Sequence, residues 1–520
     1  MTDTPSPNQD QPDGTGQAGF FASFADAVVR YRWVFLALSL AVVGVATTKI
    51  GAIWPPDPSA RIFFAEENPD RQALDAYEAA FTKDDNLTIA IVPENGEVFT
   101  PETLALIGEI TDEAWRLPFV RRVDSLTNFQ HSYADAEGLV VRDLVPEPAA
   151  LTADDTAEIE RLAMERLEIV DLLLAPEGDV TQVNVLFTLP ETNPTEEVPL
   201  IVREIKAMEE RIEAAHPVDI RLTGAIMINN QFATSGQEDS QNLLGPMFLV
   251  ILLLVGLALR SVFATVAVLI LITLSAATGL GAAGWFGYRL NSVTVLAPLY
   301  IMTLAVASAV HVFSACRAAM PDTADRKEWV RRALTEHAGA IIIACVTTAI
   351  GFYSLNFSIS PPFRQLGNVV GTGVLAALFF TLFLLPGLLI ALPIRRQKSA
   401  EREPRAMRAL ADFVVGRRRV IAPVMIGVVA LLAAGISQLK LEDDFIRYFD
   451  ERYEFREDTD FVEDRLTGVN QLYFALPAGG DQAINKPAFL QEVSAFADWL
   501  RTQPEVTHVA TLTDTLKRLT

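Results

Sequence analysis

Long apolar segments separated by polar stretches set the organisation of this chain. Runs of about spanning length lie at roughly 33–50, 241–259, 262–286, 292–316, 338–357, 366–394 and 420–438. A helix needs about 20 mainly apolar residues to cross a bilayer, so each run predicts a transmembrane helix. The first run follows a long stretch that contains acidic residues, which favours a membrane anchor over a cleaved secretory signal.

The polar stretch between the first two runs has the pattern of an α+β domain. Thr100 is suited to cap a helix whose first turn contains Pro101. The expected elements are strands at 86–92, 120–126, 181–188 and 218–223 and helices at 101–117, 152–173 and 195–215. This β-α-β order occurs twice, which predicts a ferredoxin-like fold.

An internal repeat extends across the membrane and polar segments. Phe24–Arg32 recurs as Leu410–Arg418, and Pro118–Thr127 recurs as Pro504–Thr513, both at an offset of 386 residues. The second copy is expected to open with a strand at 470–476, a helix at 487–502 and a strand at 505–511. Such a duplication is typical of membrane transporters, and two full units would need about 800 residues. We therefore expect a truncated or split chain, completed by a second half-transporter or by a homo-oligomer.

These patterns predict an α-helical polytopic membrane protein with an α+β extracytoplasmic domain and an internal repeat. The expected parts are a disordered tail at 1–22, a first transmembrane helix at 23–52, the α+β domain at 53–239, a five-helix block at 240–395, a basic linker at 396–419, a seventh helix at 420–438 and a partial second domain at 439–520.

Charge is distributed unevenly along the chain and predicts its orientation. The net charge is −23, and residues 51–239 hold 13 Lys and Arg against 38 Asp and Glu. Basic residues instead cluster before the first apolar run, at 317–332 and at 395–419. Short basic flanks stay in the cytoplasm, so the N-terminus is expected inside and the acidic domain outside the inner (plasma) membrane. The acidic balance also argues against a nucleic-acid partner.

Candidate chemistry is sparse. No phosphate-binding loop, zinc motif or nucleophile elbow is present, so no enzyme activity, cofactor or metal is expected. His311 is the side chain in the first six apolar runs that titrates near neutral pH, which makes it a proton-coupling candidate; helix packing is the alternative. Pathway or helix-packing candidates are Asn291, Tyr300, Thr303, Thr347, Thr348 and Gly371.

Several motifs resemble one family of membrane proteins. They are Val98–Leu104, Val123–Asn128, Leu290–Thr294 with Thr303–Ala307, Thr347–Phe352 and Ser360–Asn368. With the helix order, they resemble the RND (resistance–nodulation–division) superfamily, and within it the MMPL-like predicted exporters, whose five-helix block is similar to a sterol-sensing domain. The resemblance implies proton-coupled export of a hydrophobic or lipid-like molecule by a protein embedded in the lipid bilayer.

One departure from that family concerns the fourth helix. The resemblance implies an aspartate just before the histidine, and here Ser308 occupies its position in the run Ala305–His311. A serine does not exchange a proton at physiological pH. Three alternatives remain open: the relay lies in a second half, His311 replaces it, or the chain is a non-pumping lipid-sensing or scaffold protein.

Overall fold

The computed structural model describes residues 15–57, 59–81, 83, 85–135, 138–190, 193–396, 405–439, 444–468, 471–480 and 482–519. The chain forms two compact units, each assembled from two separate parts of the sequence. The helical unit combines Met1–Pro56 with Gly236–Asp443, and the α+β unit combines Asp57–Ser235 with Asp444–Thr520.

The helical unit is built from long apolar helices. Six helices in the described part of the chain are long and apolar enough to cross a membrane: Arg32–Ile53, Val262–Trp285, Thr294–Ala319, Arg326–Phe357, Pro361–Ala391 and Arg418–Gln438. Their main helical segments are α2 (Arg32–Thr47), α8 (Val262–Trp285), α9 (Ala297–Ala319), α10 (Arg326–Tyr353), α11 (Pro361–Phe379), α12 (Leu385–Ala391) and α14 (Arg418–Ala434). A π-helical turn at Phe380–Leu384 joins α11 to α12.

The transmembrane helix predicted at 241–259 is part of a longer helix, α7 (Ala225–Leu259). Its apolar portion is Gly245–Leu259, which is shorter than a full span. At 1.5 Å per residue, such a segment covers only about 22 Å of a hydrocarbon core about 30 Å thick. Polar residues of the preceding turns, such as Gln237 and Glu238, end the apolar run while the helix continues.

The chain enters the helical unit through two helices that meet at Tyr31. Helix α1 (Thr15–Arg30) precedes α2, and it buries Ala25 and Val28 among the other helices. Residues 15–22, where the composition predicts a disordered tail, are therefore helical, because an apolar face of α1 packs on α10 and α12. The rest of that predicted tail, residues 1–14, lies outside the described residues.

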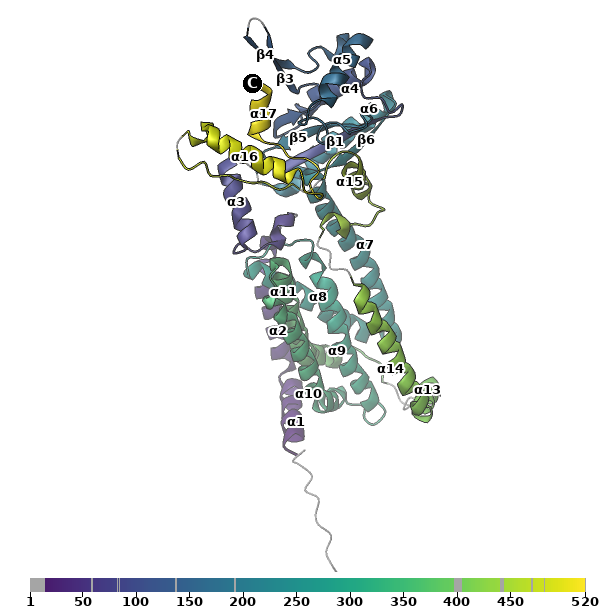
Figure 1. Cartoon of the computed structure of the whole chain (residues 1–520). Helices are drawn as coiled ribbons and strands as arrows, with labels where there is room; N and C mark the ends of the chain where they lie inside the picture. The colour runs from purple at the N-terminus through teal and green to yellow at the C-terminus, as the bar shows by residue number, and fades with distance from the viewer. Residues whose placement is uncertain are drawn as a thin grey trace, which may run out of the picture. The chain divides into compact units, whose positions relative to one another are not determined.

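Glycines bring the central helices close together, and α8, α9, α10 and α11 lie side by side in Figure 1. Ile301 of α9 inserts between Gly279 of α8 and Gly373 of α11. A Cβ on Gly279 would lie 2.5 Å from the Ile301 Cδ1, and one on Gly373 would be closer still. Small residues at these positions let the helices approach closely. Because lipid is as apolar as the side chains, such close packing is what drives helix association in a membrane.

The α+β unit contains the expected ferredoxin-like fold. Its elements are β1 (Asp85–Pro93), α4 (Pro101–Ala114), β2 (Val120–Asp124), β5 (Thr181–Phe187), α6 (Pro194–Ala215) and β6 (Val218–Thr223). The four strands form one sheet in the order β2-β5-β1-β6, and each neighbouring pair is antiparallel. This is the order that two interlocked β-α-β units produce, so the predicted fold is confirmed.

Alternate apolar side chains of β1 and the capped helix α4 form the core of this unit. Leu87, Ile89 and Ile91 are fully buried on one face of β1, beside residues of α4 and α6. The Thr100 hydroxyl accepts a hydrogen bond from the Thr103 backbone N–H (3.1 Å), with Pro101 in the first turn. The predicted cap is therefore confirmed, and it orients α4 across the sheet.

Two predicted features of this region differ in the structure. Helix α5 is confined to Ala153–Met164 rather than 152–173. Beyond it the backbone turns, with a positive φ at Asp171, and Leu173 and Leu174 are buried in the core. Burial of these side chains outweighs helix propensity. A hairpin of β3 (Gln130–Asp135) and β4 (Gly138–Asp143), which the pattern did not predict, precedes α5.

The second part of the α+β unit contains α15 (Glu454–Arg465), α16 (Pro487–Leu500) and α17 (Leu512–Leu519). Helix α16 confirms the helix predicted at 487–502. The strands predicted at 470–476 and 505–511 are wrong: residue 470 is not described, and 471–476 and 505–511 form no strand. The reason lies in the strand order. In the first copy β5 separates β1 from β2, so the counterparts of β1 and β2 alone are not neighbours and have no hydrogen-bonding partner.

Candidate functional site

Helix α9 carries the two proton-coupling candidates, and they face different surroundings. Ser308 is buried, and its hydroxyl lies 3.2 Å from the Cys345 Sγ on α10. His311, three residues later, is exposed on the surface of the chain. The two side chains therefore do not form a joint site: Ser308 belongs to the packed contact between α9 and α10, and His311 to an outer face of α9.

The exposed face of α9 is a continuous stripe. Tyr300, Thr303, Ala307, His311 and Ser314 recur at helical spacing, and all five are exposed. Three hydroxyls and one imidazole thus share one side of an otherwise apolar membrane helix. Intramembrane polar groups rarely face lipid and usually face a cavity or another helix. We call these five residues the α9 stripe.

The candidate threonines bond their hydroxyl groups back to their own helices, and the Thr303 Oγ1 also reaches the Met247 Sδ of α7 (4.0 Å). Thr303 donates to the Leu299 carbonyl oxygen (2.9 Å), and Thr347 and Thr348 donate to those of Ile343 and Ala344 (both 2.8 Å). This back-bonding satisfies a hydroxyl in an apolar environment without a partner helix. Thr347 is nevertheless exposed on α10, and Thr348 is half-buried.

Asn291 organises the turn that leads into α9. Its Oδ1 accepts from the backbone N–H groups of Val293 (3.1 Å) and Thr294 (2.9 Å). Its Nδ2 donates to the Gln365 Oε1 on α11 (2.9 Å). Asn291 is buried, and these contacts fix the start of α9 against α11. Its place in the structure is that of a turn and helix-joining residue.

Gly371 provides room for an aromatic side chain. A Cβ at this position would lie 3.0 Å from the Tyr353 ring. The Tyr353 hydroxyl lies 3.0 Å from the Thr372 Oγ1. Close by on α11, the Asn368 Nδ2 donates to the Tyr288 hydroxyl (3.0 Å), and Asn368 also pairs with Asn356.

This polar network was not among the candidates drawn from the sequence. Its members come from the α8–α9 loop, the end of α10 and the start of α11, so only the fold brings them together. The sequence does carry a signal for this network, because amide and hydroxyl side chains recur where one apolar run ends and the next begins. They are Tyr353, Asn356, Gln365, Asn368 and Thr372.

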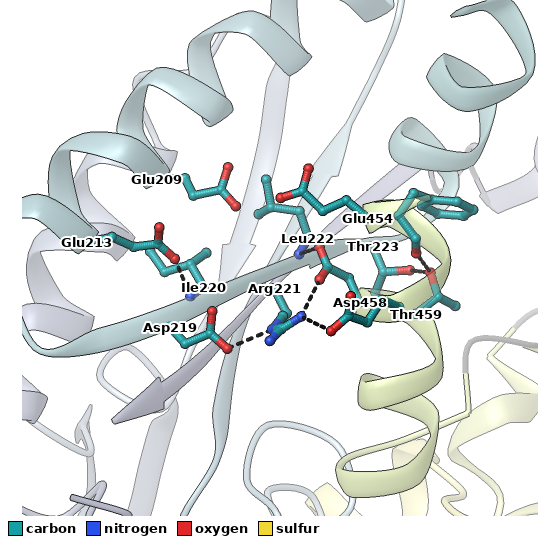
Figure 2. Close-up of polar contacts among 12 residues, drawn as sticks. Glu209, Glu213, Asp219, Ile220, Arg221, Leu222, Thr223, Glu454, Asp458 and Thr459 are labelled. Atoms are coloured by element: carbon teal, nitrogen blue, oxygen red, sulfur yellow. Dashed lines mark hydrogen bonds and ion pairs between the residues drawn. The ribbon is translucent and has the colours of Figure 1, made fainter. Parts of the chain in front are cut away.

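A second polar cluster, in the α+β unit, joins α15 to the edge strand β6, and Figure 2 shows its residues. Asp458 accepts a hydrogen bond from the Leu222 backbone N–H (3.0 Å) and pairs with Arg221 (3.2 Å). The Thr223 and Thr459 hydroxyls lie 2.6 Å apart. We call these five residues the α15 clasp. The cluster binds the second part of this unit to the first.

Burial raises the pKa of carboxyl groups in and beside the α15 clasp. Desolvation raises the pKa of Asp458 to about 6, although Leu222 and Arg221 oppose the shift. Beside it on α6, burial raises the pKa of Glu209 to about 7 against the influence of Lys206. The Lys206 Nζ lies 2.8 Å from Glu209 and 3.2 Å from Glu454 of α15. Two carboxyl groups near this contact therefore titrate close to neutrality.

Comparison with known proteins is consistent with this architecture. A family model described as MMPL family matches residues 64–423, which include the ferredoxin-like fold and helices α8 to α12. The chain is also similar to the hopanoid transporter HpnN of Rhodopseudomonas palustris (strain TIE-1), with 26% identity over 240 residues. The aligned part covers 45% of this chain and 26% of the length of that relative.

Proposed function

Because this chain belongs to the MMPL family of membrane transporters, we propose that it takes part in the proton-coupled export of a hydrophobic or lipid-like molecule. The observation that carries this proposal is the position of His311. An imidazole, a side chain that can gain and lose a proton, lies on the α9 stripe in the second half of this apolar helix. A protonatable group there can bias one arrangement of packed helices over another.

His311 takes the proton-carrying role in this proposal, and Ser308 does not. Ser308 is neutral and is held against Cys345 inside the helix packing. Protonation of His311 changes the charge on a face of α9 that the described helices of this chain leave exposed. The change therefore acts on whatever covers the α9 stripe.

A second block of helices is the proposed cover of the α9 stripe. Helix α14 is the counterpart of α2 at the repeat offset, and α2 packs on α8. No residue of α14 is buried. A second five-helix block, on the same or another polypeptide, would give α14 a helix to pack on, as α8 does for α2. The α9 stripe would then face the polar positions of that block.

An aromatic cluster in the α+β unit supports a hydrophobic cargo. Phe63, Phe232, Phe445 and Phe449 lie with ring centroids 4.9–6.3 Å apart in successive pairs. Phe445 also contacts Tyr448, which is 52% exposed. Phe232 and Phe449 are buried and Phe63 and Phe445 are half-buried, so Tyr448 is the ring among these residues that an apolar ligand could reach from the surface. The similar protein is named a hopanoid transporter, and we extend a lipid-like cargo to this chain as part of the proposal.

The proposed orientation places the N-terminus in the cytoplasm and the α+β unit outside the plasma membrane. Arg317, Arg326, Lys327, Arg331 and Arg332 lie around the connection between α9 and α10. Basic residues in short connections favour the cytoplasmic side. The net negative α+β unit is then on the side from which exported lipid leaves.

Transport by the protein purified from its native membrane, together with its bound partners, tests the proposal. Reconstituted vesicles carrying a fluorescent lipid are given a pH gradient, and lipid movement is followed. We expect movement that depends on the gradient and stops when a protonophore dissipates it. Lipid movement that is equally fast with and without the gradient would refute proton coupling.

One observation favours a second candidate, a non-pumping lipid-sensing or scaffold protein. Ser308 is the neutral residue at the position where the family resemblance implies an aspartate, and its hydroxyl is already engaged with Cys345. In that case the vesicles would bind the lipid with no gradient-dependent movement. Lipid binding without transport therefore distinguishes the two candidates.

A further inference from the structure

The repeat relates α15 to a helix of the first copy. Helix α3 (Pro69–Phe81) lies at the repeat offset from α15, just as α4 lies at that offset from α16. Helix α15, although part of the second copy, packs on the sheet of the first copy. By the same relationship, α3 of the first copy is expected to pack on the sheet of the second copy.

The contacts of α15 show how such a helix packs on the sheet of the other copy. One face of α15 buries Phe455, Asp458, Thr459 and Val462. Val462 contacts Ala90 on β1 in a small apolar cluster, and Asp458 caps the outward N–H of β6. The opposite face of β1 packs on α4. Strand β1 therefore lies between α4 of its own copy and α15 of the other.

Contacts to one helix of each copy are also present in the second copy. The segment 471–477 is the counterpart of β1, and two successive side chains in it contact two different helices. Phe474 makes an edge-to-face contact with Phe496 of α16, with ring centroids 5.3 Å apart. Tyr473 stacks on Tyr77 of α3, with ring centroids 4.9 Å apart. The second β1-like segment thus touches α16 of its own copy with one ring and α3 of the other copy with the next, while residues 471–477 remain exposed.

The α3 residues that correspond to the docking face of α15 are exposed. They are Pro69, Gln72, Ala73 and Ala76, and Ala80 corresponds to the buried Leu466; together these five residues form the α3 face. Opposite them, Arg61 pairs with Glu78 and Asp75, and Arg71 donates to the Phe64 carbonyl oxygen. Those contacts hold α3 in the unit by its other side. On the α3 face, the Gln72 Nε2 donates to the Glu66 carbonyl oxygen (3.1 Å).

We propose that the two copies exchange helices, and that the α3 face docks on the edge strand of the second sheet that is the counterpart of β6. The inference rests on the proposed second half, which would carry that strand. Gln72 stands at the position of Asp458, and its amide oxygen can accept an outward strand N–H as Asp458 does. The small side chains of Ala73, Ala76 and Ala80 allow the strand to approach closely.

The two docking contacts differ in charge. Asp458 carries a carboxyl group that gains a proton near neutrality, whereas Gln72 is neutral at all physiological pH values. The two contacts therefore differ in the group that they place against the strand edge, a carboxyl group in α15 and a neutral amide in α3.

Photocrosslinking in native membranes tests the docking of α3. The photoreactive amino acid p-benzoylphenylalanine is placed at Ala76, and in a second variant at Ala73. Leu74, on the same helix but off the α3 face and 40% exposed, is the matched control. Glu457, which lies beside Arg221 of β6 (3.2 Å), is the positive control within the chain. Mass spectrometry identifies the crosslinked peptides.

We expect positions 76 and 73 to crosslink to a strand of the polypeptide that completes the second sheet, and position 74 to lose this crosslink. A crosslink from 76 to residues 218–223 of a second copy would overturn the proposal in favour of homo-association. So would the absence of a protein crosslink at 76 and 73 while position 457 still crosslinks to β6. None of these readouts depends on transport, so they are independent of the test of proton coupling.

Discussion

The Asp458 carboxylate accepts the backbone N–H of Leu222 at 3.0 Å, although 236 residues separate the two along the chain. Leu222 lies on β6, the edge strand beside β1 in the described sheet, so alternate N–H groups of β6 point away from the sheet. The next outward N–H, that of Ile220, donates to Glu213 (2.8 Å). Carboxylates thus protect this sheet edge, and one of them comes from the other copy of the repeat.

Docking of α15 should strengthen as the pH falls. Its docked state raises the pKa of Asp458 to about 6, above the ordinary value of about 3.9, so that state binds the proton more tightly. The added stability is therefore complete below about pH 4 and is lost as the pH rises through 6, with a total of about 3 kcal/mol. Hydrogen exchange of the Leu222 amide, corrected for its intrinsic pH dependence, measures this change.

The substitution Asp458→Asn is the control for that measurement. An asparagine keeps an oxygen acceptor for Leu222 and removes the titrating group. Protection of the Leu222 amide should then be nearly constant between pH 4 and pH 8. A variant that keeps the pH dependence of the natural protein would show that another group is responsible.

The insertion of Ile301 between two glycines predicts a compensated pair of substitutions. Gly373→Ala places a methyl group against Ile301 and should lower the unfolding free energy by about 1–3 kcal/mol. Shortening the neighbour in Gly373→Ala/Ile301→Val should recover part of that loss. Thermal unfolding in detergent checks both variants. Additive losses in the double variant would mean that the two residues do not share this contact.

Ser308→Ala should leave transport intact. The hydroxyl contacts Cys345 in a buried helix interface, so its loss should cost about 1 kcal/mol of stability without removing a proton carrier. Transport rate and melting temperature are measured on the same preparation. Complete loss of transport in a folded Ser308→Ala protein would assign Ser308 a direct part in coupling.

Cysteine labelling tests the proposed orientation. Ala150 and Ala324 are both exposed alanines, the first in the α+β unit and the second in the basic connection after α9. An impermeant maleimide added to intact cells should label Ala150→Cys and not Ala324→Cys. Both native cysteines, Cys316 and Cys345, are buried and serve as the unlabelled background. The reverse labelling pattern would contradict the orientation.

Much of the fold follows from local patterns, because local chemistry decides it. The alternation of Leu87, Ile89 and Ile91 and the cap at Thr100 correctly predict β1 and α4. The strand predicted at 505–511 fails because strand formation depends on a partner, which hydrophobic alternation alone does not supply. Burial of Leu173 and Leu174 shortens α5 for a similar reason: a contact made by the fold outweighs a local preference.

The candidate functional residues, too, could be predicted only in part from the sequence. His311 is recognisable in the sequence as a titratable group in an apolar run, but the exposure of the α9 stripe depends on the packing of α8, α10 and α11. The α15 clasp has no sequence signal, because Arg221 and Asp458 lie in different copies of the repeat and the helix exchange brings them together. Charged residues in a polar domain are ordinarily solvated, and burial is what distinguishes these two.

Proton flux coupled to lipid movement, measured with His311→Gln, tests the central claim most directly. The vesicles contain the native complex, a fluorescent lipid and an internal pH dye. Ser314→Ala, which alters the same α9 stripe without removing a titratable group, is the control. We predict that His311→Gln loses both gradient-driven lipid movement and the accompanying proton flux, whereas Ser314→Ala retains both. Full gradient-driven transport by His311→Gln would contradict the account.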